Sequence, residues 1–474
     1  RHTRSYSVTG VQTFALPILT IQAGGSVSTT TGNASISTGA GDDDVTVSGA
    51  LGVHSALTVN TGTENDTVTV TSSGSATSRS FGIGTGAGTG SISVENGGTL
   101  SAEAGTGTIT TGDGADAITI SGTMSVRDAL TVTMGDGVNG LSVTGTGRAT
   151  AASFSIDTGA GTDSISLMDG GSLEANTGDG SIATGGGDDA ITFSGDLDVQ
   201  GALSVDTGAG MDRLTISESG TVNAGSLDVN TGSQADIFEN YGHIETTGMV
   251  DIVTGAGEDE VTVTGTINTS NLMIDTGDDH DMVRFDVEYN EGRQLTGPVQ
   301  VLGGEGTDWI SVNKLHTRAD VMDIDGQGDR DLYFINTRGT DDGTEVGADQ
   351  LTRIYDTGAS GVDEVTINGT SEDDVFLLRA MASPDTGFAA KLNADGNVER
   401  FNYRGIEGIT LNTMFGDDYV ASDDTLTVFT INGGVGDDRF QIGQVFKSQR
   451  DDNPDSANVA VDDAFATIEI PRGW

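Results

Sequence analysis

The residues of this 474-residue chain that could do chemistry are aspartates that follow closely spaced glycines. The stretch Thr38–Gly49 reads TGAGDDDVTVSG, and turns of the form G-x-G-x-D-x-U, where U is apolar, recur along the sequence. Ca²⁺ binds carboxylate and backbone carbonyl oxygens, six to eight at a time, in a flexible geometry. The residue types of this turn therefore predict a site for a hard divalent cation.

The aspartates that close these turns are the candidate metal ligands. Two turns have another residue in the same register, Gly90 and Asn139, and the turn DGQGDRDLYFI has Arg330 there, so these three turns are predicted to lack a site. The strongest candidates are the consecutive turns at Asp189, Asp212, Asp236 and Asp259, together with Asp438, whose motif is complete. The full set of candidates is Asp43, Asp66, Asp116, Asp163, Asp189, Asp212, Asp236, Asp259, Asp281, Asp308, Asp373, Asp418 and Asp438.

Short strands must position these turns, because apolar residues alternate with polar ones on both sides of each turn. Val45 and Val47 follow the first turn, and Leu57 and Val59 come about ten residues later. The turns recur at intervals of 23, 24 and 26 residues, which makes a 73-residue repeat of three units. Period two with Val, Ile and Thr indicates strands with one buried face, and such short strands bury that face by stacking unit on unit. The fold class expected is all-β, a parallel β-solenoid of about 24 residues per coil.

The repeat pattern divides the chain into four parts. Residues 1–18 include VTGVQTFALPI, resemble a translated sequencing adapter and are expected to be foreign. Residues 19–312 are expected to form the solenoid; no proline occurs between Pro17 and Pro298, as a continuous hydrogen-bonded ladder requires. Residues 313–446 are expected to form a less regular β region. Residues 447–474 are expected to be a loop or linker at the end of a fragment of a longer protein.

Stacking would bring the turn carboxylates of successive coils roughly 5 Å apart. Two like charges at that separation repel by about 1 kcal/mol in bulk water and by more near protein, so an aspartate column favours a bound cation. A second interpretation remains open, because Gly and Asp are ordinary turn formers and Asp accepts backbone hydrogen bonds without a metal.

The turns resemble a known calcium-binding repeat. GGVGDDRFQ (Gly433–Gln441) and GGEGTDWIS (Gly303–Ser311) fit the nonapeptide GGxGxDxUx of the RTX, or hemolysin-type, repeats, and other turns fit with Thr in the first place. The C-terminal third is similar to very large secreted bacterial RTX-like proteins. This resemblance implies an exported, calcium-dependent solenoid whose ligands are the aspartates above and turn carbonyls such as those of Gly39 and Gly41. The family places about two motifs in each coil, whereas this chain has one per ~24 residues.

Composition narrows the functional class. The net charge of −50 disfavours nucleic acid and anionic lipid as partners, and no apolar run approaches the ~20 residues of a membrane span. There is no cysteine, the five histidines are scattered, and basic and aromatic residues are scarce, so no catalytic groove is indicated and the chain is predicted not to be an enzyme.

We expect an extracellular or bacterial cell-surface protein of structural or adhesive type that binds calcium ions and contacts glycans or proteins of a surface or matrix. The alternatives are a metal-independent solenoid adhesin or autotransporter-like passenger and, less favoured, a polysaccharide-active enzyme on the same scaffold.

Overall fold

All regular structure in the described part of the chain is β-structure, and its strands wind into a parallel β-solenoid, which confirms the predicted fold class. This computed structural model describes residues 7–9, 18–286, 295–313, 321–338, 349–358, 360–383, 385–393, 397–443 and 453–456. The expected foreign segment 1–18 and the expected linker 447–474 therefore lie mostly outside the described residues. The chain divides into two compact units, Arg1–Gly248 and Met249–Trp474, which we call unit 1 and unit 2.

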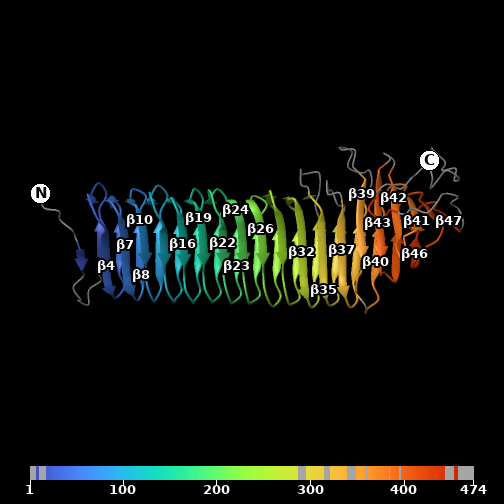
Figure 1. The fold of residues 1–474 in the computed structure, drawn as a ribbon, viewed down its shortest axis with the longest axis horizontal. Helices are drawn as coiled ribbons and strands as arrows, with labels where there is room; N and C mark the ends of the chain where they lie inside the picture. The colour runs from blue at the N-terminus through green and yellow to red at the C-terminus, as the bar shows by residue number, and fades with distance from the viewer. Residues whose placement is uncertain are drawn as a thin grey trace. The chain divides into compact units, whose positions relative to one another are not determined.

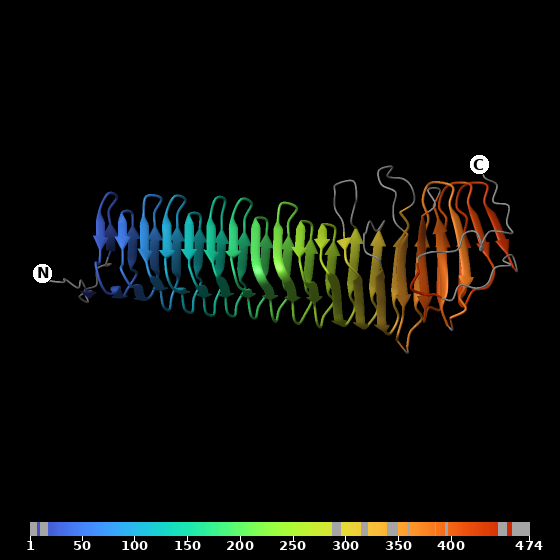
Figure 2. The same cartoon turned by 45° about the horizontal axis from the view of Figure 1, so that its top comes forward.

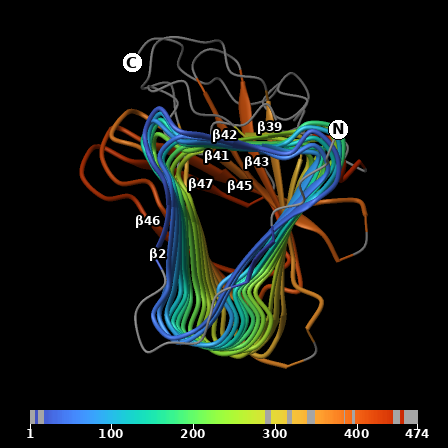
Figure 3. The same cartoon turned by 90° about the vertical axis from the view of Figure 1, so that its left-hand side faces the viewer.

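Each coil of unit 1 contributes strands to three stacked faces, and the coils trace a three-sided outline when viewed along their axis in Figure 3. Within each face, every strand pairs in parallel with the strand of the next coil, so the blue-to-green coils form a regular row (Figures 1 and 2). Face 1 follows the glycine–aspartate corner, face 2 comes next, and face 3 leads back to that corner.

The strands of unit 1 follow this order in every coil. Face 1 consists of β2 (Ile18–Ile21), β5 (Asp44–Val47), β8 (Asp66–Val70), β11 (Gly90–Val94), β14 (Ala117–Ile120), β17 (Gly140–Val143), β20 (Ser164–Leu167), β23 (Ala190–Phe193), β25 (Arg213–Ile216) and β27 (Ile237–Asn240). Face 2 consists of β3 (Ser26–Ser28), β6 (Ala50–Gly52), β9 (Ser75–Ser78), β12 (Thr99–Ala102), β15 (Thr123–Val126), β18 (Arg148–Ala151), β21 (Ser172–Ala175), the first parts of β24 (Asp196–Asp206) and β26 (Thr221–Asn230), and β28 (His243–Thr246). Face 3 consists of β1 (Ser7–Thr9), β4 (Ala34–Ala40), β7 (Ala56–Thr63), β10 (Ser80–Gly84), β13 (Gly107–Thr110), β16 (Ala129–Thr133), β19 (Ser153–Asp157), β22 (Gly180–Ala183) and the second parts of β24 and β26.

Unit 2 keeps faces 1 and 3 and adds an antiparallel insertion. Face 1 consists of β30 (Glu260–Val263), β33 (Met282–Asp286), β36 (Trp309–Asn313), β38 (Leu332–Asn336), β40 (Glu364–Asn368), β44 (Gly408–Asn412) and β46 (Val428–Asn432). Face 3 consists of β29 (Met249–Val253), β32 (Asn271–Asp278), β35 (Val299–Glu305), β37 (Met322–Gly328), β39 (Gln350–Tyr355) and β43 (Val398–Arg404), and face 2 is represented by β31 (Thr266–Asn268) and β34 (Leu295–Thr296). The remaining strands are β41 (Val375–Ala380), β42 (Gly387–Leu392), β45 (Tyr419–Ser422) and β47 (Arg439–Ile442).

The regular winding of unit 2 continues past Asn313, where the sequence pattern loosens. Strand β36 pairs in parallel with β38, and β38 pairs in parallel with β40. The irregular part of this region is a meander in which β42 pairs antiparallel with both β41 and β43. The meander joins the solenoid through parallel pairs at its two edges, β43 with β39 and β41 with β45.

The core consists of columns of apolar side chains, one residue per coil. On face 1 of unit 1 the column is continuous and buried throughout; it consists of Val45, Val68, Ile92, Ile118, Leu141, Ile165, Ile191, Leu214 and Phe238. Burying each of these side chains in the stack stabilises the folded chain by roughly 1.5–3 kcal/mol.

The 73-residue repeat predicted from the sequence corresponds to three coils and sets the size of the side chains in the first column of face 3. Leu130, Phe154 and Gly180 follow one another in register in that column. A side chain at Gly180 would place its Cβ 2.5 Å from Cζ of Phe154, so the phenyl ring covers the space above the glycine. Large and small residues therefore alternate with the repeat and fill the core without overpacking.

Candidate functional site

In each unit, most of the predicted turn aspartates stack in register at the corner where a face 3 strand turns into a face 1 strand. We call this set the inner aspartate column. In unit 1 it consists of Asp43, Asp66, Gly90, Asp116, Asn139, Asp163, Asp189, Asp212 and Asp236, and in unit 2 of Asp259, Asp281, Asp308, Asp331 and Asp363. Every one of its aspartates is at most 4% exposed. Ten of these twelve aspartates are candidates from the sequence, whereas Asp331 and Asp363 are not, and the fold turns all twelve inward.

Most column carboxyl groups accept a backbone N–H of the coil before them, whereas the carboxyl group of Asp43 in the first coil accepts none from the described residues. The N–H of Asp189 donates to Oδ1 of Asp212 at 2.8 Å, and the N–H of Asp212 donates to Oδ1 of Asp236 at 2.8 Å. The same bond recurs along both units, with distances of 2.5–3.1 Å in unit 1 and 2.8–2.9 Å in unit 2. Each of these bonds satisfies a buried amide at the corner, where the strand ladder is interrupted.

The second carboxyl oxygen has a different environment. In the described structure, Oδ2 of Asp116, Asp189 and Asp212 is buried and has no hydrogen-bond donor. A threonine hydroxyl lies nearby in each of these coils, but Thr111, Thr184 and Thr207 donate their single proton to a carbonyl of the next coil at 3.0–3.1 Å. A carboxylic acid would supply its own proton at Oδ2, and the threonine oxygen is available as its acceptor.

Burial accordingly raises the pKa of these groups. It raises the pKa of Asp189 to about 6 and that of Asp281 to about 7, and the N–H bond from the preceding coil only partly offsets the loss of hydration. Burial also raises the pKa of Asp66, Asp116, Asp163 and Asp212 above 3.8. The column is therefore a row of buried acids, several of them with raised pKa values, rather than a row of exposed carboxylates.

The coil of Asn139 shows the same hydrogen bonds made without an acid. Met134 takes the place of the threonine in this coil, so no hydroxyl is present to donate to the next coil. Nδ2 of Asn139 donates to the carbonyls of Thr158 at 2.8 Å and Gly135 at 2.9 Å, while its Oδ1 accepts the N–H of Asp116. An amide thus supplies the acceptor and the donor that the corner requires.

The acidic residues just before the column form a second, exposed set of bonds that run in the opposite direction. Oδ1 of Asp188 accepts the N–H of Met211 in the following coil at 3.0 Å. Oδ1 of Asp42 accepts the N–H of Asn65 in the same way. Carboxyl groups of the turns therefore accept hydrogen bonds from backbone amides of both the preceding and the following coil. The turn carbonyl of Gly39 points toward Gly62 of the next coil, where an added Cβ would lie 1.4 Å from its oxygen.

Two register assignments near the C-terminus change in the structure. Asp331, not Arg330, occupies the column, because Gln327 and Asp329, with φ of +72° and +67°, take the places that Gly304 and Gly306 hold in the preceding coil. Oδ1 of Asp331 accepts the N–H of Asp308. Asp373 is exposed and binds the N–H of Asp417, so its assignment to the column position was wrong by one residue. Asp374 holds that position and binds Asp418.

The last predicted ligands belong to a separate column at another corner. Asp374, Asp418 and Asp438 lie where face 1 strands lead into β41, β45 and β47. The N–H of Asp374 donates to Oδ1 of Asp418, and the N–H of Asp418 donates to Oδ1 of Asp438. Asp438 is only half-buried, although its motif is the most complete in the chain. Two unrelated corners use the same sequence motif, so the motif alone did not reveal that there are two columns.

Three buried carboxyl groups converge in unit 2, and the sequence pattern did not predict this triad. One oxygen each of Asp331, Asp356 and Asp363 lies within 4.8 Å of the others. The hydroxyl of Tyr333 donates to Oδ2 of Asp356 at 2.8 Å and accepts the N–H of Gly326. Burial, followed by the neighbouring carboxyl groups, raises the pKa of Asp331 to about 8 and that of Asp363 to about 6. Asp356 follows strand β39 outside any glycine motif, so only the winding brings it here.

Unit 2 also contains a row of hydrogen-bonded asparagines at the ends of its face 1 strands. Nδ2 of Asn368 donates to Oδ1 of Asn336 at 2.7 Å, and Asn412 donates to Asn368 at 2.8 Å. The endings ISVN, YFIN, VTIN, ITLN and FTIN in the sequence are a signal that could have revealed this row.

No known family model matches this chain, and no curated protein matches it either. The likeness to RTX repeats therefore rests on the turn motif alone. The described residues include no helix with the length and apolar character of a membrane crossing.

An alanine at one column position tests the structural role of the carboxyl group. Asp212→Ala is expected to destabilise unit 1 by about 1–3 kcal/mol, because the N–H of Asp189 would lose its acceptor in a buried corner. Asp212→Asn is expected to cost nothing at neutral pH, because an amide keeps the acceptor and Asn139 shows that the corner accommodates it. Thermal melting followed by circular dichroism compares the two variants. Equal losses in both would contradict the assigned role.

Proposed function

We propose that this chain is a structural β-solenoid of extracellular or bacterial cell-surface type, a stalk or adhesive element that keeps its shape without a bound metal. One observation carries the proposal: the column aspartates accept backbone N–H bonds from the preceding coil in both units. The groups expected to hold calcium are thereby engaged in joining coil to coil. Apolar columns supply the rest of the cohesion, as they do in other stacked-repeat proteins.

The surface composition supports an extracellular structural role. Outward positions of the strands are rich in Ser and Thr, and the net charge of −50 keeps such a surface hydrated and repels nucleic acid. Long strand edges are buried by the next coil, which leaves few free edges for aggregation. Glycans or proteins of a cell surface or matrix are the partners that this proposal implies, and it assigns no catalytic activity.

Calcium binding remains the second candidate, and the carboxyl triad is the observation that favours it. Asp331, Asp356 and Asp363 supply three carboxyl groups in one buried place, whereas the regular corners have one per coil. Ca²⁺ binds several carboxylates at once and would remove their mutual repulsion. A calcium-dependent RTX-like protein would hold its ion at this triad before any other part of the described chain.

Melting with and without calcium distinguishes these two functions. We expect the same melting temperature in excess chelator and in about 1 mM calcium, because the proposed solenoid needs no metal. The calcium concentration is chosen because extracellular modules bind calcium with affinities of ~10⁻⁴–10⁻³ M and would be stabilised in that range. Isothermal titration provides the independent check on ion uptake. A calcium-induced rise in melting temperature that Asp356→Asn abolishes would refute metal independence and place the ion at the triad. The exposed variant Asp188→Asn is the matched control, because it removes one charge far from the triad in sequence.

A further inference from the structure

The antiparallel meander of unit 2 gathers four polar side chains on one of its faces. In register, Lys391 lies opposite Phe376 on one side and opposite Glu399 on the other. Asn393 and Asp374 fall on the same face, because they lie two residues from Lys391 and from Phe376. We call Asp374, Lys391, Asn393 and Glu399 the Lys391 cluster.

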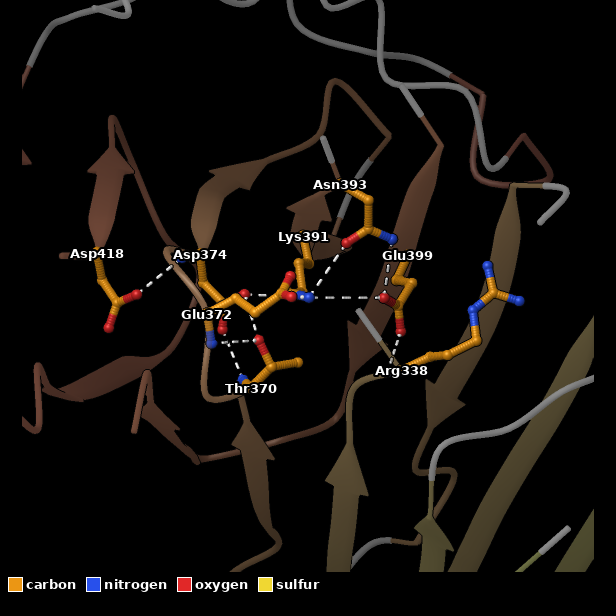
Figure 4. Close-up of polar contacts among 8 residues, drawn as sticks. All are labelled: Arg338, Thr370, Glu372, Asp374, Lys391, Asn393, Glu399 and Asp418. Carbon is orange, nitrogen blue, oxygen red and sulfur yellow. Dashed lines mark hydrogen bonds and ion pairs between the residues drawn. The ribbon is translucent and has the colours of Figure 1, made fainter. Parts of the chain in front are cut away.

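The amino group of Lys391 lies between these groups, as Figure 4 shows, and its side chain is buried. Its Nζ lies 3.1 Å from Oδ1 of Asp374, 3.1 Å from Oδ1 of Asn393 and 4.0 Å from Oε1 of Glu399. The side chains of Lys391 and Asp374 are each 3% exposed, and that of Glu399 is 4% exposed. Phe376, on the same face, is fully buried.

Neighbouring groups hold the cluster in this arrangement. Asp374 accepts the N–H of Thr370 at Oδ2 and its hydroxyl at Oδ1, at 2.6 and 2.9 Å. Nδ2 of Asn393 donates to Oε1 of Glu399 at 3.0 Å, so the same amide positions both the amine and this carboxyl group. The backbone N–H of Arg338 donates to Oε2 of Glu399 at 2.8 Å (Figure 4). A nucleophile, an acyl carbon and a proton carrier are thus fixed within contact distance.

We propose that Lys391 and Asp374 condense into an intramolecular amide bond. The ammonium of Lys391 first passes one proton to the carboxylate of Asp374, which leaves a free amine beside a carboxylic acid. Nζ then forms a bond to Cγ of Asp374, and Glu399 takes the proton that the attacking nitrogen releases. Glu399 returns that proton to the hydroxyl oxygen on Cγ, the C–O bond breaks and water leaves. The ammonium and carboxylate of the ion pair become one neutral amide and one water molecule, so atoms and charge balance and no oxidant is needed.

The surroundings favour this product over the ion pair. Burying an ammonium and a carboxylate in an apolar interior removes the hydration of two ions, a cost that a neutral amide does not incur. The bond would tie β42 to the turn before β41 and close a loop of 18 residues, from 374 to 391. Such a cross-link restricts the unfolded chain as a disulfide does, in a protein that has no cysteine. The proposal concerns unit 2 alone and does not depend on whether the chain binds calcium.

Intact-mass spectrometry of the folded, purified chain tests the proposal. We expect a mass lower than that of the sequence by one water, about 18 Da. Trypsin is then expected to leave peptide 354–379 joined to peptide 380–400, because acylated Lys391 is no longer a cleavage site. A chain that is folded by circular dichroism and has its full sequence mass would overturn the proposal. Loss of ammonia, with the link to Asn393, would overturn the assignment to Asp374.

Two variants test the assigned roles, and a third serves as control. Lys391→Met and Glu399→Gln are both expected to give the unlinked mass and separate tryptic peptides, the first for lack of a nucleophile and the second for lack of a proton carrier. Glu364→Gln, which changes an exposed acid paired with Arg330, is expected to stay linked. A fully linked Glu399→Gln chain would remove Glu399 from the mechanism.

Discussion

Lowering the pH from about 8 to about 5 is expected to raise the melting temperature of this acidic protein by several degrees. The cause is the inner aspartate column, where burial raises the pKa of Asp189 and Asp308 to about 6 and that of Asp281 to about 7. In the unfolded chain these groups titrate near 3.8. Between the two values the folded protein binds more protons than the unfolded chain, so the free energy of unfolding increases as the pH falls.

The direction of this effect separates the column from an ordinary set of surface carboxylates. A salt-bridged aspartate has a lowered pKa and loses its contribution in acid. Asp189, Asp281 and Asp308 instead contribute fully below about pH 4, and this contribution is lost as the pH rises through their raised pKa values of about 6 to 7. Calcium ligands would also behave in the opposite way, because protons compete with the ion for the same oxygens.

Melting curves across this pH range, with a matched pair of variants, check the prediction. Asp189→Asn is expected to flatten the dependence on pH, because the amide keeps the bond to Asp163 and cannot titrate. Asp188→Asn removes the same charge from the neighbouring exposed residue and is expected to leave the dependence unchanged. Equal slopes for the two variants would show that general charge repulsion, and not the column, sets the response.

Replacing Gly187 by alanine is expected to destabilise the surrounding coils by about 3 kcal/mol or more. Gly187 has φ of +133°, a conformation that side chains rarely adopt, and an added Cβ would lie 2.0 Å from the carbonyl oxygen of Gly161 in the preceding coil. Both contact partners are backbone, and the strand ladders of all three faces fix the spacing between coils. Neither coil can therefore move away without breaking hydrogen bonds.

The glycine beside it provides a matched control. Gly186→Ala is expected to leave stability unchanged, because its nearest neighbour would be the carbonyl oxygen of Ala209 at 3.7 Å, an ordinary contact. Alanine already occupies the equivalent place at Ala160 and Ala209 in the adjoining coils. Melting temperature and amide hydrogen exchange at this corner compare the two variants. Similar exchange in both would contradict the close-packing account of the G-x-G motif.

The fold could be predicted from the sequence because its determinants are local and repeated. Alternation of the kind seen at Val45 and Val47 specifies a strand and its buried face, and the interval of about 24 residues specifies the length of a coil. Once both are given, parallel stacking is the arrangement that buries every apolar face. The register of regular turns, including Asp189, Asp212 and Asp236, followed correctly.

The environment of the site could not be predicted in the same way. Whether the carboxyl group of Asp212 faces outward to an ion or inward to an amide depends on the corner geometry, which G-x-G-x-D does not encode. At Asp331 the turn glycines are out of register by one residue, and the turn of Asp363 has one extra residue. Asp356 joins these two from a strand end with no motif. The Lys391 cluster likewise depends on antiparallel pairing, which the parallel repeat gave no reason to expect.

By itself the sequence determined that this chain winds into stacked coils with acidic corners, since periodicity and turn residues act over a few neighbours. Only the tertiary structure decided what those acids contact, because burial and hydrogen bonding at a corner are set by the coil on either side. Each of these hydrogen bonds joins two residues that are one full coil apart in the sequence, and it forms only when the winding places one coil upon the next.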